Sequence, residues 1–198
     1  MTNRKLNLFN YHRTRKQISE EDEQVRRAQR DRRHFSVLYD RHYEAIYWYV
    51  FNRVEDETLA DDLVSQVFTK ALHHLPRYQF RGVPFVSWLY RIAKNELNQW
   101  FRTQKSQRVV SLEKVQLQHL TEEWEAEYPE QAVEAMLAAI RQLKLAEIEL
   151  IEMRFFEQRP FKEIAEILEI TENNAKVRTY RVVEKLRKKL VPGKEGAL

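Results

Sequence analysis

Apolar residues recur at three- and four-residue steps along most of the chain, which is the spacing of amphipathic α-helices. The longest run extends from Phe35 to Val54. The acidic residues 55–57 end it and open a second run, which Pro76 ends. A third run covers residues 84–102. No segment alternates with the period of two that is typical of strands, so the sequence predicts an all-α protein.

The same pattern divides the chain into two helical domains. Ser19 supplies a hydroxyl N-cap and acidic residues follow it, so the first domain is predicted to cover residues 20–103. Residues 104–128 lose the sustained period and turn acidic, which is typical of a linker. A second domain is predicted over residues 129–191, with helices at about 129–142, 146–157, 160–168 and 172–190. The remaining segments are a basic N-terminal arm and a tail, at residues 1–19 and 192–198.

Composition narrows the classes of function. Only three glycines occur, and Gly82 alone lies outside the tail, which excludes a glycine-rich phosphate loop. Cysteine is absent, so disulfides and thiolate chemistry are excluded. The six histidines lack metal-ligand spacing, and the adjacent Asp61 and Asp62 are poorly arranged as an acid–base pair. We interpret these side chains as a solvated helix surface, and we predict no enzymatic activity, no metal and no cofactor.

Hydropathy and charge indicate the compartment and the partner. The apolar runs are all far shorter than the roughly 18 residues that span a bilayer, and the N-terminus lacks the apolar segment of a secretory signal. The sequence therefore predicts a cytoplasmic protein without membrane insertion. The net charge of +4 and the pI near 9.2 make nucleic acid the first partner to consider.

The strongest binding pattern lies near the C-terminus. A short helix over residues 160–168 is followed by a tight turn at Glu169 and Ile170, and Thr171 is an N-cap for a basic helix. This order is typical of the helix-turn-helix, whose second helix enters the major groove of DNA with its N-terminal part. An ordinary basic surface helix is the alternative interpretation.

A second basic cluster, at residues 77–108, carries aromatic side chains between its cations. Cations follow a phosphate backbone and aromatic rings stack on unpaired bases, so this combination favours a melted DNA strand. Tyr78 and Phe80 lie in a loop and are the better candidates for base contact. Phe85 and Trp88 share the apolar helical face, and we expect them in the core.

Three motifs carry a resemblance to a known family. Residues 61–72 (DDLVSQVFTKAL) resemble the DLVQEVFLRAW helix of bacterial sigma factors, and residues 85–95 (FVSWLYRIAKN) resemble their F-x-x-WLYRIARN helix. Residues 161–168 (FKEIAEIL) and 176–178 (KVR) resemble their SYEEIAEILGI…VKSR region. The resemblance covers residues 20–190 without a further domain, which indicates the small extracytoplasmic-function (ECF) class of the sigma-70 family.

The resemblance implies that the partners are core RNA polymerase and promoter DNA, together with an anti-sigma factor such as many relatives have. Docking on the clamp coiled coil of the largest polymerase subunit would use Asp61, Asp62, Leu63, Gln66, Val67 and Phe68. The minus-ten element would be contacted by Arg77, Tyr78, Phe80, Arg81, Arg91, Lys94, Asn95, Asn98 and Arg102. The minus-thirty-five element would be read by Thr171, Glu172, Asn173, Asn174, Lys176, Arg178 and Arg181.

The sequence also departs from the family pattern. Glu169 occupies a turn position where the family usually has glycine, which costs free energy if the backbone needs a positive φ. Val177 replaces a small polar residue, and Thr179 replaces a leucine on the core face of the last helix.

Two alternatives to a sigma factor are open from the sequence. One is a helix-turn-helix regulator that binds duplex DNA as a dimer without polymerase, which leaves the acidic helix and the aromatic loop unexplained. The other, more distant, is an enzyme that processes nucleic acid, which the missing metal and nucleophile patterns disfavour.

Overall fold

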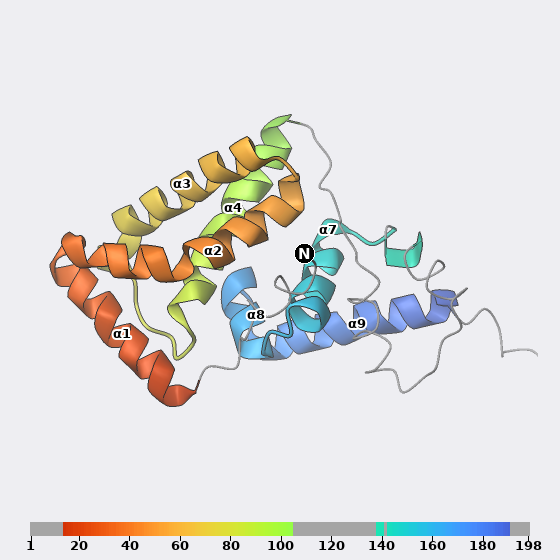
Figure 1. Cartoon of the computed structure of the whole chain (residues 1–198). Helices are drawn as coiled ribbons and strands as arrows, with labels where there is room; N and C mark the ends of the chain where they lie inside the picture. The colour runs from red at the N-terminus through yellow and green to blue at the C-terminus, as the bar shows by residue number, and fades with distance from the viewer. Residues whose placement is uncertain (1–13, 105–137, 141, 191–198) are drawn as a thin grey trace, which may run out of the picture. The chain divides into compact units, whose positions relative to one another are not determined.

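The computed structural model describes residues 14–104, 138–140 and 142–190, and within these ranges the chain forms helices and no strand (Figure 1). The predicted all-α class is confirmed. The chain divides into two compact units, one built on residues 14–104 and the other on most of the described residues from 138 onward. Most of the predicted arm, the linker beyond Gln104 and the predicted tail lie outside the described residues. Within the described ranges, no helix has the length and apolar character needed to cross a bilayer.

The first unit opens with α1 (Arg15–Arg30), and a capping box sets its start. The Thr14 hydroxyl accepts a hydrogen bond from the Gln17 N–H at 3.3 Å, and the Gln17 side chain accepts one from the Thr14 N–H at 2.8 Å. This reciprocal pair satisfies two N–H groups that a helix start leaves without partners. The predicted start at Ser19 is therefore wrong, because Ser19 lies inside the helix.

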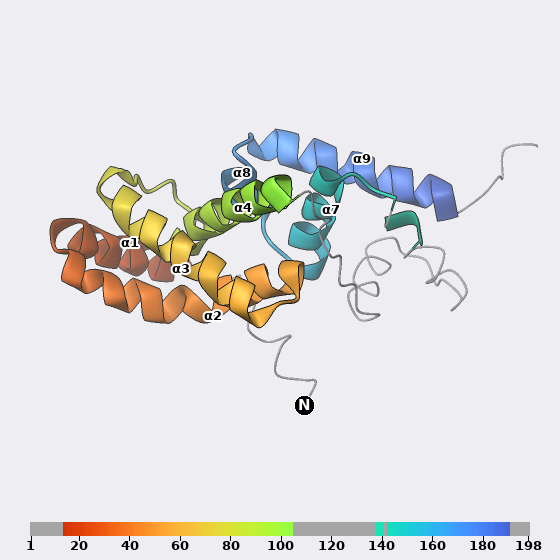
Figure 2. The ribbon, with the colours of Figure 1, turned by 90° about the horizontal axis from the view of Figure 1, so that it is seen from above.

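The core of the first unit is built from three long helices, which lie side by side in both views (Figures 1 and 2). They are α2 (Phe35–Val54), α3 (Glu57–His74) and α4 (Phe85–Gln104). Glu55 ends α2 with a left-handed φ of 53°, and Asp56 caps α3 by accepting the Leu59 N–H at 2.9 Å. Short 3₁₀ turns precede α2 (Arg32–His34) and follow α3 (Leu75–Arg77). The three predicted helices of this unit are confirmed.

A buried polar pair joins α1, α2 and α4. Glu21 and His42 are each 1% exposed, and His42 Nε2 lies 2.9 Å from Glu21 Oε1. Glu21 Oε2 accepts the backbone N–H of Phe85 at 2.8 Å, which caps the start of α4. A buried carboxylate is costly unless it is paired and hydrogen-bonded, so these contacts fix the three helices relative to one another. The interpretation of His42 as a solvated side chain is therefore wrong.

The second unit contains α7 (Leu145–Ile151), a π-helical turn (Glu152–Phe156), α8 (Phe161–Leu168) and α9 (Glu172–Leu190). The helices predicted at 146–157, 160–168 and 172–190 are confirmed, and most of the segment at 129–142 lies outside the described residues. Thr179 lies on the core face of α9, as predicted, and it is buried there together with Ala175, Val182 and Leu186.

Two side chains of α9 make polar contacts within the second unit, one inside the helix and one to α7. The Thr179 hydroxyl donates to the Ala175 carbonyl at 2.8 Å, so the polar atom in the core face is satisfied. Lys185 donates to Glu147 at 2.8 Å and ties α9 to α7. Against the effect of burial, the hydrogen bond from Lys185 lowers the pKa of the Glu147 carboxyl.

Candidate nucleic-acid and polymerase interfaces

The turn between α8 and α9 has the geometry that a helix-turn-helix requires. Glu169 adopts a φ of 57°, and the Ile170 N–H donates to the Ala165 carbonyl at 3.0 Å, which closes a Schellman motif. The Thr171 hydroxyl then accepts the Asn174 N–H at 3.2 Å and caps α9. The N-cap at Thr171 is the predicted one. The positive φ at Glu169 meets the condition under which the sequence analysis expects a cost in free energy.

The side chains predicted to read DNA from this unit lie on the surface of α9, on the side away from its buried face. Asn174 is half-buried, and the exposed members are Thr171, Glu172, Asn173, Lys176, Arg178 and Arg181. Val177 and Tyr180 are exposed among them, although the sequence interpretation did not include either one. The departure of Val177 from the family pattern was the signal that could have found it.

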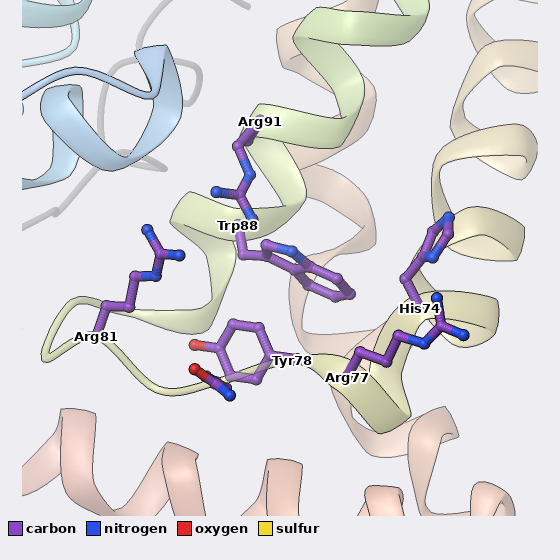
Figure 3. Close-up of a pocket in the computed structure, with 7 residues that line it drawn as sticks. His74, Arg77, Tyr78, Arg81, Trp88 and Arg91 are labelled. Carbon is purple, nitrogen blue, oxygen red and sulfur yellow. The ribbon is translucent and has the colours of Figure 1, made fainter.

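In the first unit, a pocket of about 170 Å³ opens between the end of α3, the following loop and α4 (Figure 3). It brings together four of the residues predicted to contact DNA, namely Arg77, Tyr78, Arg81 and Arg91. His74, Gln79 and Trp88 complete the lining. Guanidinium groups donate hydrogen bonds only, and aromatic rings offer stacking faces, so the lining suits a nucleotide.

Tyr78 is held firmly at this pocket. Its ring centroid lies 5.0 Å from that of Trp88 and 5.2 Å from that of Phe85. The Gln29 side chain donates to the carbonyls of Leu75 and Tyr78, both at 2.9 Å, which anchors the loop to α1. Burial, with the nearby carboxylates of α1, raises the pKa of Tyr78, so the hydroxyl stays neutral.

The other loop aromatic and the distal part of α4 are more open. Phe80 is 41% exposed. Asn95, Asn98 and Arg102 are exposed along α4, and Lys94 is half-buried. Glu96, the only acidic residue of the basic cluster, is buried and accepts from Lys70 of α3 at 2.6 Å. Its charge is therefore balanced within the unit and does not oppose a phosphate backbone.

The predicted polymerase-docking helix is α3, and its six candidate residues separate into two groups. Asp61, Asp62 and Gln66 are exposed. Leu63, Val67 and Phe68 are buried in the core between α3 and its neighbours, so they lie away from the surface that a partner would reach. Leu63 and Val67 are four residues apart and Phe68 directly follows Val67, so the three side chains share the inner face of the helix.

A row of aromatic side chains on α2 adjoins the acidic face of α3. The Tyr43 hydroxyl donates to Asp61 Oδ1 at 3.0 Å, and burial together with this bond raises the pKa of Tyr43 to about 12. Ring centroids along the row are 5.3 Å apart for Tyr39 and Tyr43, and 6.1 Å apart for Tyr43 and Tyr47. The surface therefore combines carboxylates with partly exposed rings, which suits a protein partner.

Within the described residues, no group of three or more side chains of the metal-binding types could hold a metal ion.

Two family models match the chain, and together they cover more than half of it. Sigma-70 region 2 matches residues 38–107, and Sigma-70 region 4 matches residues 133–186. The chain belongs to the sigma-70 family of RNA polymerase sigma factors.

Individual relatives agree with this assignment. The sigma factor is 29% identical over 160 residues to the ECF RNA polymerase sigma factor BldN of Streptomyces coelicolor, covering 79% of this chain and 60% of BldN. It is 29% identical over 154 residues to the RNA polymerase sigma factor SigZ of Bacillus subtilis, covering 77% and 85%. It is 27% identical to the ECF RNA polymerase sigma factor SigX of Bacillus subtilis, covering 78% and 82%. It falls in the ECF group.

The fold also matches a solved structure, that of CnrH in complex with the cytosolic domain of CnrY. The TM-score is 0.54 at 22% identity, covering 84% of the sigma factor and 94% of CnrH. The two matched regions confirm the resemblance stated from the sequence motifs. A helix-turn-helix regulator that acts without polymerase is not favoured, because region 2 accompanies region 4.

Proposed function

We propose that this sigma factor binds core RNA polymerase, recognises a two-part promoter and promotes opening of the DNA, while polymerase performs the covalent chemistry. The observation that carries the proposal is the cationic and aromatic pocket at Arg77, Tyr78 and Arg91 in region 2, in a chain that also has a capped helix-turn-helix in region 4. A regulator of duplex DNA alone has no need of the pocket.

The minus-ten element would be handled by the pocket and by α4. An unpaired base would stack on the exposed ring of Phe80 or enter beside Tyr78 and Trp88, and the arginines would bind the adjoining phosphates. Arg91, Lys94, Asn95, Asn98 and Arg102 follow one another along α4 at helical spacing, so they would track the DNA that leads to the melted strand.

Core polymerase would dock on the exposed side of α3, at Asp61, Asp62 and Gln66. The chain as a whole has a net charge of +4, but these carboxylates are negative, so they attract a basic protein surface and repel the phosphates of DNA. Leu63, Val67 and Phe68 would support this face from inside the unit by holding α3 in place.

The minus-thirty-five element would be read by the N-terminal part of α9. Asn173, Arg178 and Arg181 would approach base edges, and Lys176 would hold phosphate. We also propose a protein partner of the anti-sigma kind, because CnrH is found in complex with the cytosolic domain of CnrY. Such a partner would compete with polymerase for the α2–α3 surface.

Run-off transcription with purified core polymerase tests the proposal. Core polymerase would transcribe DNA templates that carry a random sequence upstream of a transcribed tag, with and without the sigma factor. The templates that give transcripts would then be sequenced. We expect transcripts only with the sigma factor, and enrichment of two separated elements. Specific duplex binding by a dimer of the chain, without association with polymerase and without transcripts, would contradict it.

A further inference from the structure

The exposed side of α9 carries two apolar side chains among its cations. Val177 is 38% exposed and Tyr180 is 43% exposed, whereas Ala175, Val182 and Leu186 close the opposite side into the core. Residues three apart on a helix are neighbours on its surface, so these two side chains form one apolar patch. Exposing apolar side chains to water is unfavourable, so a complementary surface that covers this patch would gain binding free energy.

The position of Tyr180 is fixed by α8. The ring centroids of Tyr180 and Phe161 lie 6.0 Å apart at an angle of 50°, and the Arg154 guanidinium lies 4.8 Å above the Phe161 ring. This stack supports Tyr180 from one side. The patch therefore lies on the first half of α9, where such a helix comes closest to base pairs, and α8 supports it through Phe161.

Charge around the patch identifies its occupant as DNA. Lys176, Arg178 and Arg181 are exposed beside Val177, and Glu184, the next acidic residue along α9, is near Lys188 at 4.0 Å. A polyanion fits this surface, and the major groove of DNA offers one apolar group, the C5-methyl of thymine. On the basis of the proposed function, we propose that Val177, braced by Tyr180, contacts a thymine methyl in the minus-thirty-five element.

Replacing thymine with deoxyuridine tests the contact directly, because uracil keeps the pairing and every hydrogen-bonding group of thymine and lacks only the methyl. The full sigma factor with core polymerase would be bound to promoters recovered from the run-off library. Each thymine of the upstream element would be replaced in turn. We expect one position at which the loss of the methyl weakens binding about fourfold, the size expected for burying one methyl group.

Val177 variants then assign the effect to this side chain. With Val177→Ala or Val177→Ser, thymine and deoxyuridine at that position should bind equally well, and the other positions should be unchanged. Tyr180→Ala should reduce the discrimination, and Tyr180→Phe should retain it. Val37, which is 47% exposed on α2, provides the matched control, because Val37→Ala removes an exposed valine from the other unit.

The outcomes separate this inference from the proposed function. If the holoenzyme binds and transcribes specifically but no deoxyuridine position matters, or if the element contains no thymine, the methyl contact is overturned and the proposed function stands. If Val177→Ala weakens association with core polymerase and leaves base discrimination intact, the patch is a protein interface and the inference is again wrong. Absence of any promoter-specific binding would overturn both.

Discussion

Tyr78 and Phe80 are two residues apart in the same loop, yet their surroundings give them different tasks. Tyr78 packs against Phe85 and Trp88 and forms part of the pocket wall, whereas Phe80 is open to solvent. The sequence treats both as loop aromatics with equal access to a base. The difference arises because Tyr78 packs against the helix that follows the loop. A loop has no regular residue spacing, so the sequence alone could not predict which of the two rings makes this contact.

We therefore expect Phe80→Ala to impair DNA opening without loss of stability. An exposed ring adds little to folding, but stacking on an unpaired base contributes about 1–3 kcal/mol. Permanganate reactivity of thymines in the open complex measures the opening, and thermal unfolding measures stability. Phe80→Leu keeps an apolar side chain without a ring and should share the defect, and Tyr78→Phe should behave like wild type. Wild-type reactivity in Phe80→Ala would show that this ring does not capture a base.

The burial of ionisable side chains is the other feature of single residues that the sequence does not reveal. Glu21, His42 and Arg159 are each almost inaccessible, and their neighbours come from other turns or other helices. Hydrophobic periodicity assigns such residues to the surface by default. Their burial is possible only because partners meet them in the folded unit, so composition and spacing could not have placed them in the core.

At the scale of elements, the sequence predicted the start of a helix correctly where an N-cap residue is followed by an apolar run with the helical period. Asp56 and Thr171 each accept the N–H group that an N-cap should accept, and the helices they begin were found within a few residues. The start of α1 was missed because its first turn lacks an apolar period and depends on the Thr14–Gln17 box. The π-helical turn was missed too, since its bonding leaves no distinct sequence pattern.

The left-handed residue in the helix-turn-helix gives a prediction at this scale. Glu169→Gly should stabilise the second unit by about 1 kcal/mol or less. A left-handed conformation costs a residue with a Cβ roughly 1–2 kcal/mol, and the freedom of glycine in the unfolded chain offsets part of the gain. Hydrogen exchange of the α8 and α9 amides in urea measures the change.

Two further variants test whether the effect belongs to the turn. Glu169→Val places a β-branched side chain at a positive φ and should destabilise the unit. Glu184→Gly puts glycine inside α9 and should cost about 1 kcal/mol. Stabilisation by both glycine variants, or by neither, would contradict the assigned role of Glu169.

For the whole molecule, the division into two helical units and the helix-turn-helix could be predicted because both depend on local patterns. The pocket could be predicted only in part. Its arginines stood out as a basic cluster, but His74, Gln79 and Trp88 join them only when the end of α3 packs near α4. The helix proposed for polymerase docking, α3, was predicted from its helical period, and its buried and exposed faces became distinct only in the folded unit.

The distribution of charge over the molecule supplies the last prediction. Reversing Asp61 and Asp62 to lysine should weaken association with core polymerase about tenfold or more, because like-charge contacts at an interface cost several kcal/mol. Fluorescence anisotropy of labelled sigma factor titrated with core polymerase measures this affinity, and the defect should shrink as added salt screens the charges.

A matched control makes the same charge change on α1, with Glu20→Lys and Glu23→Lys. Both residues are exposed, and this double variant should leave the affinity for core polymerase near wild type. Equal losses in the two double variants would mean that net charge, rather than the α3 face, governs docking. Because the side chains of Leu63, Val67 and Phe68 remain buried in either variant, helicity should be unchanged and the comparison reports the surface alone.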